Sequence, residues 1–207
     1  METRLLSTSH PDALAAAEDI LNQGGLVAFP TDTVYGLAAL VSSETGIARL
    51  YAAKERSTNK AIAVLIGEQS QLAFLTPGLS ASAYRLAEAF WPGALTLVVA
   101  KNLALPANLS PLPTIGVRMP DHPFAQALMQ RCGPLATTSA NLSGESNALN
   151  ADQVLEQLAG RVELLVDGGT VPGGVPSTVI DCTKTPPVIL RHGAISEAAI
   201  LRMLDDE

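Results

Sequence analysis

The stretch from Gly24 to Leu37 constrains the fold most, because an apolar strand there runs directly into a polar turn. All residues from Leu26 to Phe29 are apolar, and glycines precede them. A short apolar run bounded by turn-forming residues is typical of a buried strand. Pro30 has no N–H to donate to a neighbouring strand, so the strand cannot simply continue.

The residues after Pro30 are rich in hydroxyl groups, and Thr31, Asp32, Thr33 and Tyr35 follow the strand end directly. In α/β folds ligands are met at such strand ends. We therefore interpret this turn as one wall of a binding site. The alternative is a turn that is merely rich in turn-forming residues.

The length and composition predict one globular domain over residues 1–207. A chain of 207 residues with 47% apolar residues has enough material for one sizeable core. No apolar run is long enough to span a bilayer and no signal-like segment follows Met1, so we expect a cytoplasmic protein without membrane association. Cys132 and Cys182 lie far apart, without Cys or His at metal-ligand spacing, so we expect reduced thiols and no metal site.

The charge pattern favours a small anionic ligand. A net charge of −7 argues against a broad basic surface for nucleic acid. Five of the thirteen basic residues nevertheless fall in or next to turn-rich segments, and these are Lys54, Arg56, Lys60, Arg118 and Arg191. This placement predicts a focused anion-binding pocket in an otherwise acidic protein.

The pattern along the chain predicts alternating helices and strands, and therefore an α/β fold with a mixed sheet and flanking helices. We expect helices over 11–22, 44–53, 80–90, 124–131, 152–158 and 196–204. We expect strands over 26–29, 37–41, 61–66, 94–99, 134–136, 162–166, 179–182 and 188–190. Several of these strands end in polar turns that together line one concavity.

Lys54 and Arg56 are two residues apart, so their side chains share one side only if the backbone is extended there. We therefore expect the preceding helix to end before Lys54. Solvated charges in a loop are the alternative. Trp91 adjoins a helix end and a Pro-Gly turn, which favours a packing role over a platform for nucleobases.

Three further segments are candidates for ligand contact. Around residue 118, Val117 and Met119 are expected to face the core while Arg118 faces a cleft. The segment 137–144 is predicted to be a turn dense in hydroxyl and amide groups, with capping of a following helix as the alternative. The glycine-rich segment 167–178 matches neither the phosphate-binding P-loop nor the dinucleotide fingerprint. The loop 102–113 is a candidate border or lid.

Together these segments resemble the YrdC/Sua5 family of threonylcarbamoyl-adenylate synthases. The matching pieces occur in family order over nearly the whole chain: residues 29–37, Lys54-x-Arg56 with Lys60, 91–96, 117–123, 139–144, 177–181 and Arg191-x-Gly193. The resemblance implies a twisted α/β sheet curved around a deep, positively lined cavity.

The resemblance also implies a reaction. L-threonine and bicarbonate or CO2 give a carbamate that attacks the α-phosphorus of ATP, with Mg²⁺ on the triphosphate, to form threonylcarbamoyl-AMP and pyrophosphate. A separate transferase complex then modifies adenosine 37 of ANN-decoding tRNAs. Direct tRNA binding by this chain is expected to be weak, and no resident metal site is implied.

Site residues carry over from the resemblance position by position. It places Thr33 and Ser177 at L-threonine, with Arg118 and Ser139 at the amino-acid or carbamate end. Around the nucleotide and its phosphates it places Lys54, Arg56, Lys60, Thr114, Asn141 and Arg191. Of these residues, Lys54, Arg56, Ser139 and Asn141 are the expected catalytic set.

The chain departs from the family pattern at one loop. Where the family commonly has prolines, this chain has Ser57 after Arg56 and Ala61 after Lys60. The cationic loop is therefore expected to be less rigid, which leaves the role of Lys60 open. The short form without an extra C-terminal domain is expected. Two alternatives are a carbamoyl-adenylate-type site and a divergent RNA-binding maturation factor.

Overall fold

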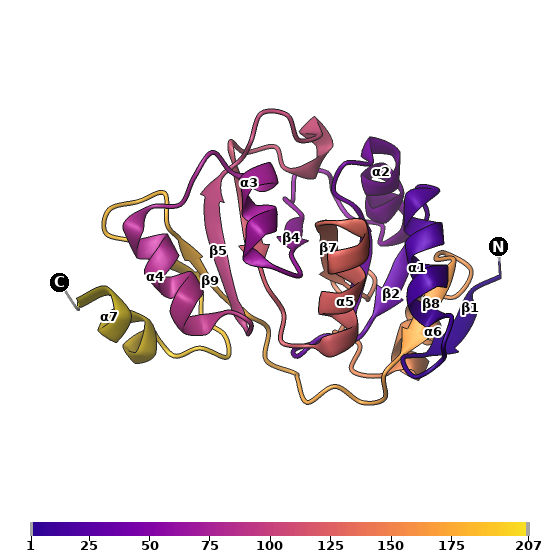
Figure 1. The fold of residues 1–207 in the computed structure, drawn as a ribbon. Coiled ribbons are helices and arrows are strands. Elements are labelled where there is room, and N and C mark those ends of the chain that lie inside the picture. Colours follow the sequence, from indigo (N-terminus) through magenta and orange to yellow (C-terminus); the bar gives the residue numbers. More distant parts are fainter. Residues whose placement is uncertain (1, 206–207) are drawn as a thin grey trace.

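The structure, a computed structural model, describes residues 2–205 and is built on one ten-stranded mixed sheet. The strand order is β1-β8-β2-β3-β7-β4-β6-β5-β9-β10, and the two chain termini lie at opposite ends of the molecule (Figure 1). The strands are β1 (Arg4–Ser7), β2 (Val27–Phe29), β3 (Gly36–Leu40), β4 (Ala63–Leu65), β5 (Leu95–Ala100), β6 (Thr114–Arg118), β7 (Leu135–Ser139), β8 (Leu164–Asp167), β9 (Thr178–Asp181) and β10 (Val188–Arg191).

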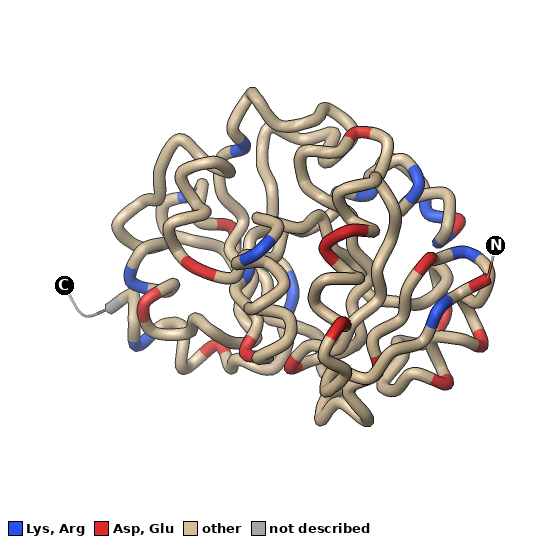
Figure 2. The backbone as a smooth tube through the Cα atoms, turned by 45° about the vertical axis from the view of Figure 1, so that its right-hand side comes forward, with Lys and Arg blue, Asp and Glu red and all other residues tan. Residues whose placement is uncertain are grey.

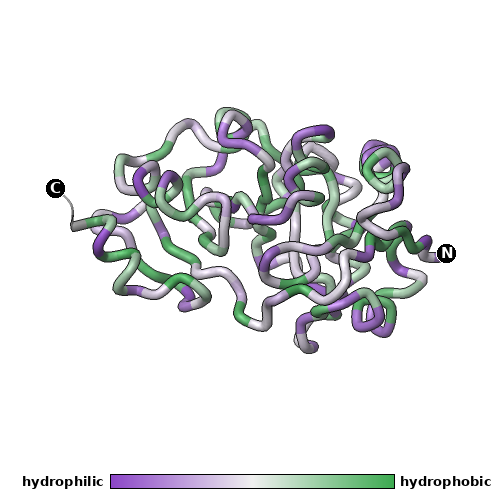
Figure 3. Tube along the Cα trace, turned by 60° about the horizontal axis from the view of Figure 1, so that its bottom comes forward, coloured by the Kyte–Doolittle hydropathy of each residue, from purple (hydrophilic) through white to green (hydrophobic). Residues whose placement is uncertain are grey.

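Helices cover both faces of the sheet. The α-helices are α1 (Ala13–Asn22), α2 (Glu44–Ala53), α3 (Leu72–Leu75), α4 (Ala81–Phe90), α5 (Pro123–Cys132), α6 (Ala151–Leu158) and α7 (Glu197–Asp205), and two 3₁₀ turns span Gln69–Gln71 and Ala107–Leu109. Along the outer helices, hydrophobic and hydrophilic residues alternate, as expected for elements with one buried face (Figure 3).

Strand β2 is buried on both faces, which explains its uninterrupted apolar sequence. Val27 and Phe29 pack on one face, in a cluster with residues of α1 and α5. Ala28 points to the opposite face, where the larger cluster gathers residues of α2, α4 and α6. Period-two alternation thus places successive side chains of one strand in two different cores.

Most predicted elements are confirmed, and the bounds of one are exact. Helix α2 begins at Glu44 and ends at Ala53, because the Ser43 side chain accepts the amide N–H of Gly46 at 3.0 Å and caps the first turn. Trp91 is a packing residue as expected, since it is buried and its indole N–H donates to the Leu95 carbonyl at 2.7 Å.

Three sequence expectations differ from the structure. Strand β1 and the helical segment 69–75 were not predicted. Thr137 to Ser139, expected in a turn, are strand residues that extend β7, and they pair with β3 over the register Gly36↔Ser139. The small residue Gly36 leaves room for the β7 side chains, since the Thr137 methyl group lies 3.0 Å from where a Cβ would be.

Loop 102–113 is anchored at several points. Leu105, Leu109 and Ser110 are buried, and the Ile62 amide N–H donates to the Leu109 carbonyl at 3.1 Å. Within residues 2–205, no helix is both long enough and apolar enough to cross a bilayer.

Candidate active site

A cavity of about 430 Å³ lies on one face of the sheet, the same face as α1 and α5. Six of the residues that line it were predicted to be site residues: Thr33, Arg56, Arg118, Ser139, Ser177 and Arg191. They come from chain segments between residues 33 and 191, so the fold brings together what the sequence separates.

Small residues on three strands of the sheet form part of the floor of the cavity. Gly36 on β3, Ala63 on β4 and Gly116 on β6 all line it. A Cβ at Gly116 would lie 3.0 Å from the methyl group of Thr96, closer than an ordinary contact. The floor is therefore hollow at these three positions, while Thr137 and Ser139 of β7 and Arg118 of β6 also line the cavity.

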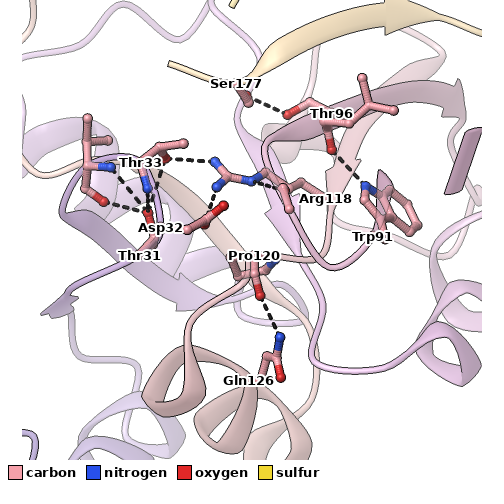
Figure 4. A network of polar contacts seen from close by, with 12 residues as sticks. Thr31, Asp32, Thr33, Trp91, Thr96, Arg118, Pro120, Gln126 and Ser177 are labelled. Carbon is pink, nitrogen blue, oxygen red and sulfur yellow. Dashed lines mark hydrogen bonds and ion pairs between the residues drawn. The ribbon is translucent and has the colours of Figure 1, made fainter. Parts of the chain in front are cut away.

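Arg118, at the end of β6, is the buried cation of the site and is 6% exposed. Its guanidinium group forms an ion pair with Asp32, donates to Thr33 Oγ1 at 2.9 Å, and donates through Nε to the Gly93 carbonyl at 2.9 Å (Figure 4). Burial lowers the pKa of Arg118 and the Asp32 carboxylate offsets part of this effect. The guanidinium group is thus held rigidly, as a preorganised charge requires.

The turn after β2 is held by its own hydroxyl groups. Thr31 Oγ1 donates to the Val34 carbonyl at 2.6 Å, and Thr31 Oγ1 also lies 3.2 Å from Thr33 Oγ1. These contacts are a threonine turn of the kind that competes with regular secondary structure. Thr33 is 3% exposed and faces Arg118, so its hydroxyl group is fixed at the cavity wall.

The opposite wall is built from β5, β9 and β10. Thr96 Oγ1 and Ser177 Oγ are 2.8 Å apart, and the Arg191 guanidinium donates to the Ser177 carbonyl at 2.9 Å and to its Oγ at 3.0 Å. Burial lowers the pKa of Arg191. Arg191 therefore fixes Ser177 and presents its own charge to the same cavity.

Arg56 is the third guanidinium group of the cavity. Its Nη2 donates to the Ala61 carbonyl at 3.0 Å, while its Nε is buried and has no hydrogen-bond partner among the described residues. Burial lowers the pKa of Arg56. An unpartnered buried donor at a cavity wall is suited to an acceptor on a ligand.

The charge of the cavity contrasts with that of the chain. Three guanidinium groups line it, and the Asp32 carboxylate beside it is already paired with Arg118. Elsewhere, acidic and basic positions are scattered over the backbone, with acidic ones in excess (Figure 2). The described residues hold no cluster of three or more His, Cys, Asp or Glu side chains arranged for a metal ion. The arrangement can therefore bind and polarise a small anion.

Four predicted site residues do not line the cavity in this structure: Lys54, Lys60, Thr114 and Asn141. Lys60 is exposed, and its carbonyl accepts the Tyr51 hydroxyl group at 2.9 Å. The Asn141 amide nitrogen donates to the Leu142 carbonyl at 2.7 Å, and Asn141 Oδ1 is buried without a partner in the described part of the chain.

The backbone between Lys54 and Arg56 is not extended, contrary to expectation. The helix ends before Lys54 as predicted, but Lys54 keeps helical dihedral angles and Glu55 has a φ of 53°. This left-handed residue sends the two cations in different directions. Lys54 is 1% exposed and lies behind the wall, so it is not a solvated loop charge.

Several lining residues were not assigned to the site from the sequence. They include Thr96 and Asn147, whereas Thr31, Thr137 and Thr138 lie in the two hydroxyl-rich segments already interpreted as candidates for ligand contact. The signal that finds the strand residues is alternation. Thr96 and Gly116 share a face of adjacent strands, opposite the apolar Leu97 and Val117.

Tyr35 supports the site from behind. It is fully buried, its hydroxyl group donates to the Gly169 carbonyl at 2.7 Å, and it accepts the Gly168 amide N–H at 3.0 Å. Burial raises its pKa to about 12. Tyr35 thus ties the glycine-rich loop, which leads to Ser177, to the turn that carries Thr33.

With this geometry in view, comparison with known proteins assigns the family. The model for Sua5/YciO/YrdC proteins, described as "Telomere recombination", matches residues 19–193. The chain belongs to the Sua5/YciO/YrdC family. Among curated relatives, the threonylcarbamoyl-AMP synthase of Bacillus subtilis is 42% identical over 201 residues, covering 94% of this chain and 57% of the relative. The chain thus spans just over half the length of the first curated relatives it matches.

Solved structures show that this Sua5/YciO/YrdC chain has the YrdC-like fold. The Sua5 protein of Pyrococcus abyssi complexed with L-threonine superimposes with a TM-score of 0.95 at 36% identity, covering 99% of this chain and 62% of that one. Escherichia coli YciO superimposes with a TM-score of 0.85 at 25% identity, and the match covers 96% of this chain and 99% of YciO.

We predict that Gly173 tolerates no side chain, because a Cβ there would lie 1.3 Å from the Thr33 carbonyl oxygen. Gly173→Ala should displace the loop and lower the free energy of unfolding by about 2 kcal/mol, as overpacking does. Urea unfolding measures this loss. Gly78→Ala is the matched control, because nothing lies within 4 Å of its added Cβ. Equal stability of the two variants would contradict this close contact.

Proposed function

We propose that this chain forms threonylcarbamoyl-AMP and pyrophosphate from L-threonine, bicarbonate or CO2, and ATP. The observation that carries the proposal is the convergence of Arg56, Arg118 and Arg191 on one cavity beside the threonine-rich turn. The 42% identity to the threonylcarbamoyl-AMP synthase of Bacillus subtilis supports the proposal, and so does the 36% identity to the Sua5 protein that was solved with L-threonine.

The proposed chemistry joins two steps. The amine of L-threonine adds to CO2 and loses a proton to water, which gives a carbamate anion, and a carbamate oxygen then attacks the α-phosphorus of ATP. The bond from the α-phosphorus to the bridging oxygen breaks, and pyrophosphate leaves with the electron pair. The carbamate is already an anion, so this attack needs no general base. Positioning and electrostatic stabilisation are what the protein supplies.

The proposed roles divide the cavity residues into two groups. Thr33, Ser177, Arg118 and Ser139 bind threonine and its carbamate. Arg56 and Arg191 bind the triphosphate, where negative charge grows on non-bridging and leaving oxygens during attack. Lys60, Thr114 and Asn141 remain proposed nucleotide contacts.

Mg²⁺ is proposed to enter with the nucleotide. The cavity offers hydroxyl groups, and its nearest carboxylate, Asp32, is held by Arg118. Such a donor set does not fit a resident divalent cation, which prefers several free oxygen ligands. We therefore assign the ion to the triphosphate and derive no step through it.

Downstream, we propose that the product goes to a tRNA threonylcarbamoyl-transferase complex for modification of adenosine 37, in the cytoplasm. A mixed anhydride of a carbamic acid and AMP is reactive toward water, so it is useful only if a transferase consumes it before it hydrolyses. Direct tRNA binding is proposed to be weak, because the acidic balance of the chain provides few phosphate contacts.

Two alternatives are open to the same experiments. A carbamoyl-adenylate-type site would show competition between carbamoyl phosphate and threonine. An RNA-binding maturation factor would bind tRNA in a salt-dependent manner that survives Arg118→Ala and would show no adenylation. The buried, ion-paired position of Arg118 favours a small ligand over either a large one or a surface contact.

We predict threonine-dependent release of pyrophosphate from purified protein supplied with ATP, bicarbonate and Mg²⁺, because threonine carbamate is the proposed nucleophile. Coupled pyrophosphate assays measure the rate with and without threonine. Omission of bicarbonate, in CO2-free buffer, is the matched control and should also abolish release. Release that does not respond to threonine would refute the proposal.

We predict that Arg56→Ala and Arg191→Ala each lower turnover on the order of 10²-fold, because each removes a fixed charge from the phosphate site. Steady-state pyrophosphate release measures both. Arg202→Ala, which removes an exposed arginine of α7, is the control and should keep wild-type turnover. If both cavity variants kept full turnover, the assignment of Arg56 and Arg191 to the phosphate site would be wrong.

A further inference from the structure

Lys54 is a buried cation that does not line the cavity. It follows the last residue of α2, is 1% exposed, and is the largest charged side chain among the fully buried ones described. Its ammonium group donates to two carbonyl oxygens, those of Ser139 and Asn141. No ion pair of the described residues includes it, so no carboxylate balances its charge at contact distance.

Those two carbonyl groups belong to the turn that leaves β7. The Asn141 amide N–H donates to the Ser139 carbonyl at 3.0 Å, which brings both carbonyl groups close together. Further along, the Ser143 amide N–H donates to the Lys54 carbonyl at 2.9 Å. Lys54, directly after α2, therefore holds segment 139–143 through three hydrogen bonds, two from its side chain and one to its backbone carbonyl.

These hydrogen bonds of Lys54 matter because Ser139 lines the cavity. Its backbone faces two directions: it pairs with Gly36 of β3 inside the sheet, and its carbonyl oxygen accepts the Lys54 ammonium group behind the wall. Moving that carbonyl group would move the hydroxyl group of the same residue. Displacements of about 1 Å in a substrate-positioning group can cost on the order of 10²-fold in rate.

A buried ammonium group without a carboxylate is costly to maintain, and a methionine would fill similar volume without that cost. Burial, and secondly the nearby Arg56, lower the pKa of Lys54 to about 7. Its N–H groups satisfy two buried carbonyl oxygens in return. Arg56, two residues later, reaches the cavity instead, so the two cations of one motif have different tasks.

We propose that Lys54 is a positioning residue, which fixes the turn carrying Ser139 at the cavity wall and makes no contact with the nucleotide. The proposal rests on the proposed function of the cavity for its effect on rate. It replaces the direct nucleotide contact that the family resemblance assigned to Lys54.

A double-mutant cycle on pyrophosphate release separates the two roles. Lys54→Met should lower kcat/KM on the order of 10²-fold in the wild-type background, but less than about threefold in a Ser139→Ala background, because residues that act as a unit are not additive. Lys184→Met, at an exposed lysine, is the control and should change neither background. Equal effects of Lys54→Met in both backgrounds would overturn the proposal, since a direct phosphate contact acts independently of Ser139.

Amide hydrogen exchange tests whether Lys54 holds segment 139–143, and it needs no activity assay. Amides of segment 139–143 should exchange faster in Lys54→Met than in wild type, while Lys54→Gln, which keeps two N–H donors, should recover part of the protection. Unchanged exchange in both variants would overturn the proposal even in an active enzyme. If Lys54→Met exchanged faster but the wild-type protein released no pyrophosphate, the positioning role of Lys54 would stand. Only the proposed function would then be rejected.

Discussion

The buried ion pair between Arg118 and Asp32 is the interaction on which the rest of the site depends. It joins the end of β6 to the turn after β2, although β3, β7 and β4 lie between those strands in the sheet. The cost of burying two charges is offset only when the other N–H groups of the arginine also find acceptors, and here Thr33 Oγ1 and the Gly93 carbonyl accept them. Removal of one partner of such a pair typically costs about 3–5 kcal/mol. The polar turn near the N-terminus is thus held in place by a cation that comes 86 residues later.

The sheet makes this pairing useful because three positions on its cavity side carry little or no side chain. Gly36, Ala63 and Gly116 leave a hollow, and rigid cores on both sheet faces hold its walls. Three guanidinium groups reach the hollow from different elements: Arg56 follows α2, Arg118 ends β6 and Arg191 ends β10. An acidic chain can in this way keep a positive cavity, since the local field depends on a few nearby charges more than on the net charge.

The local sequence pattern predicted most helices and strands, but it predicted fewer of the contacts between them. Helix α2 and the packing role of Trp91 were predictable because capping, periodicity and turn chemistry act over a few residues. Strand β1 was missed because a short edge strand with mostly exposed residues has no apolar pattern. The strand state of Thr137 depends on its partners Ala38 and Ala63, and the divergence of Lys54 and Arg56 depends on the left-handed Glu55 between them. The first is a tertiary effect and the second a local backbone conformation, and residue spacing encodes neither.

The central claim is that one cavity holds both threonine and the nucleotide. The most direct measurement is a crystal structure of the chain with L-threonine and a non-hydrolysable ATP analogue. The account predicts both molecules in the cavity, with threonine beside Thr33 and Ser177 and the triphosphate between Arg56 and Arg191. A nucleotide bound outside the cavity, with threonine alone inside it, would contradict the account.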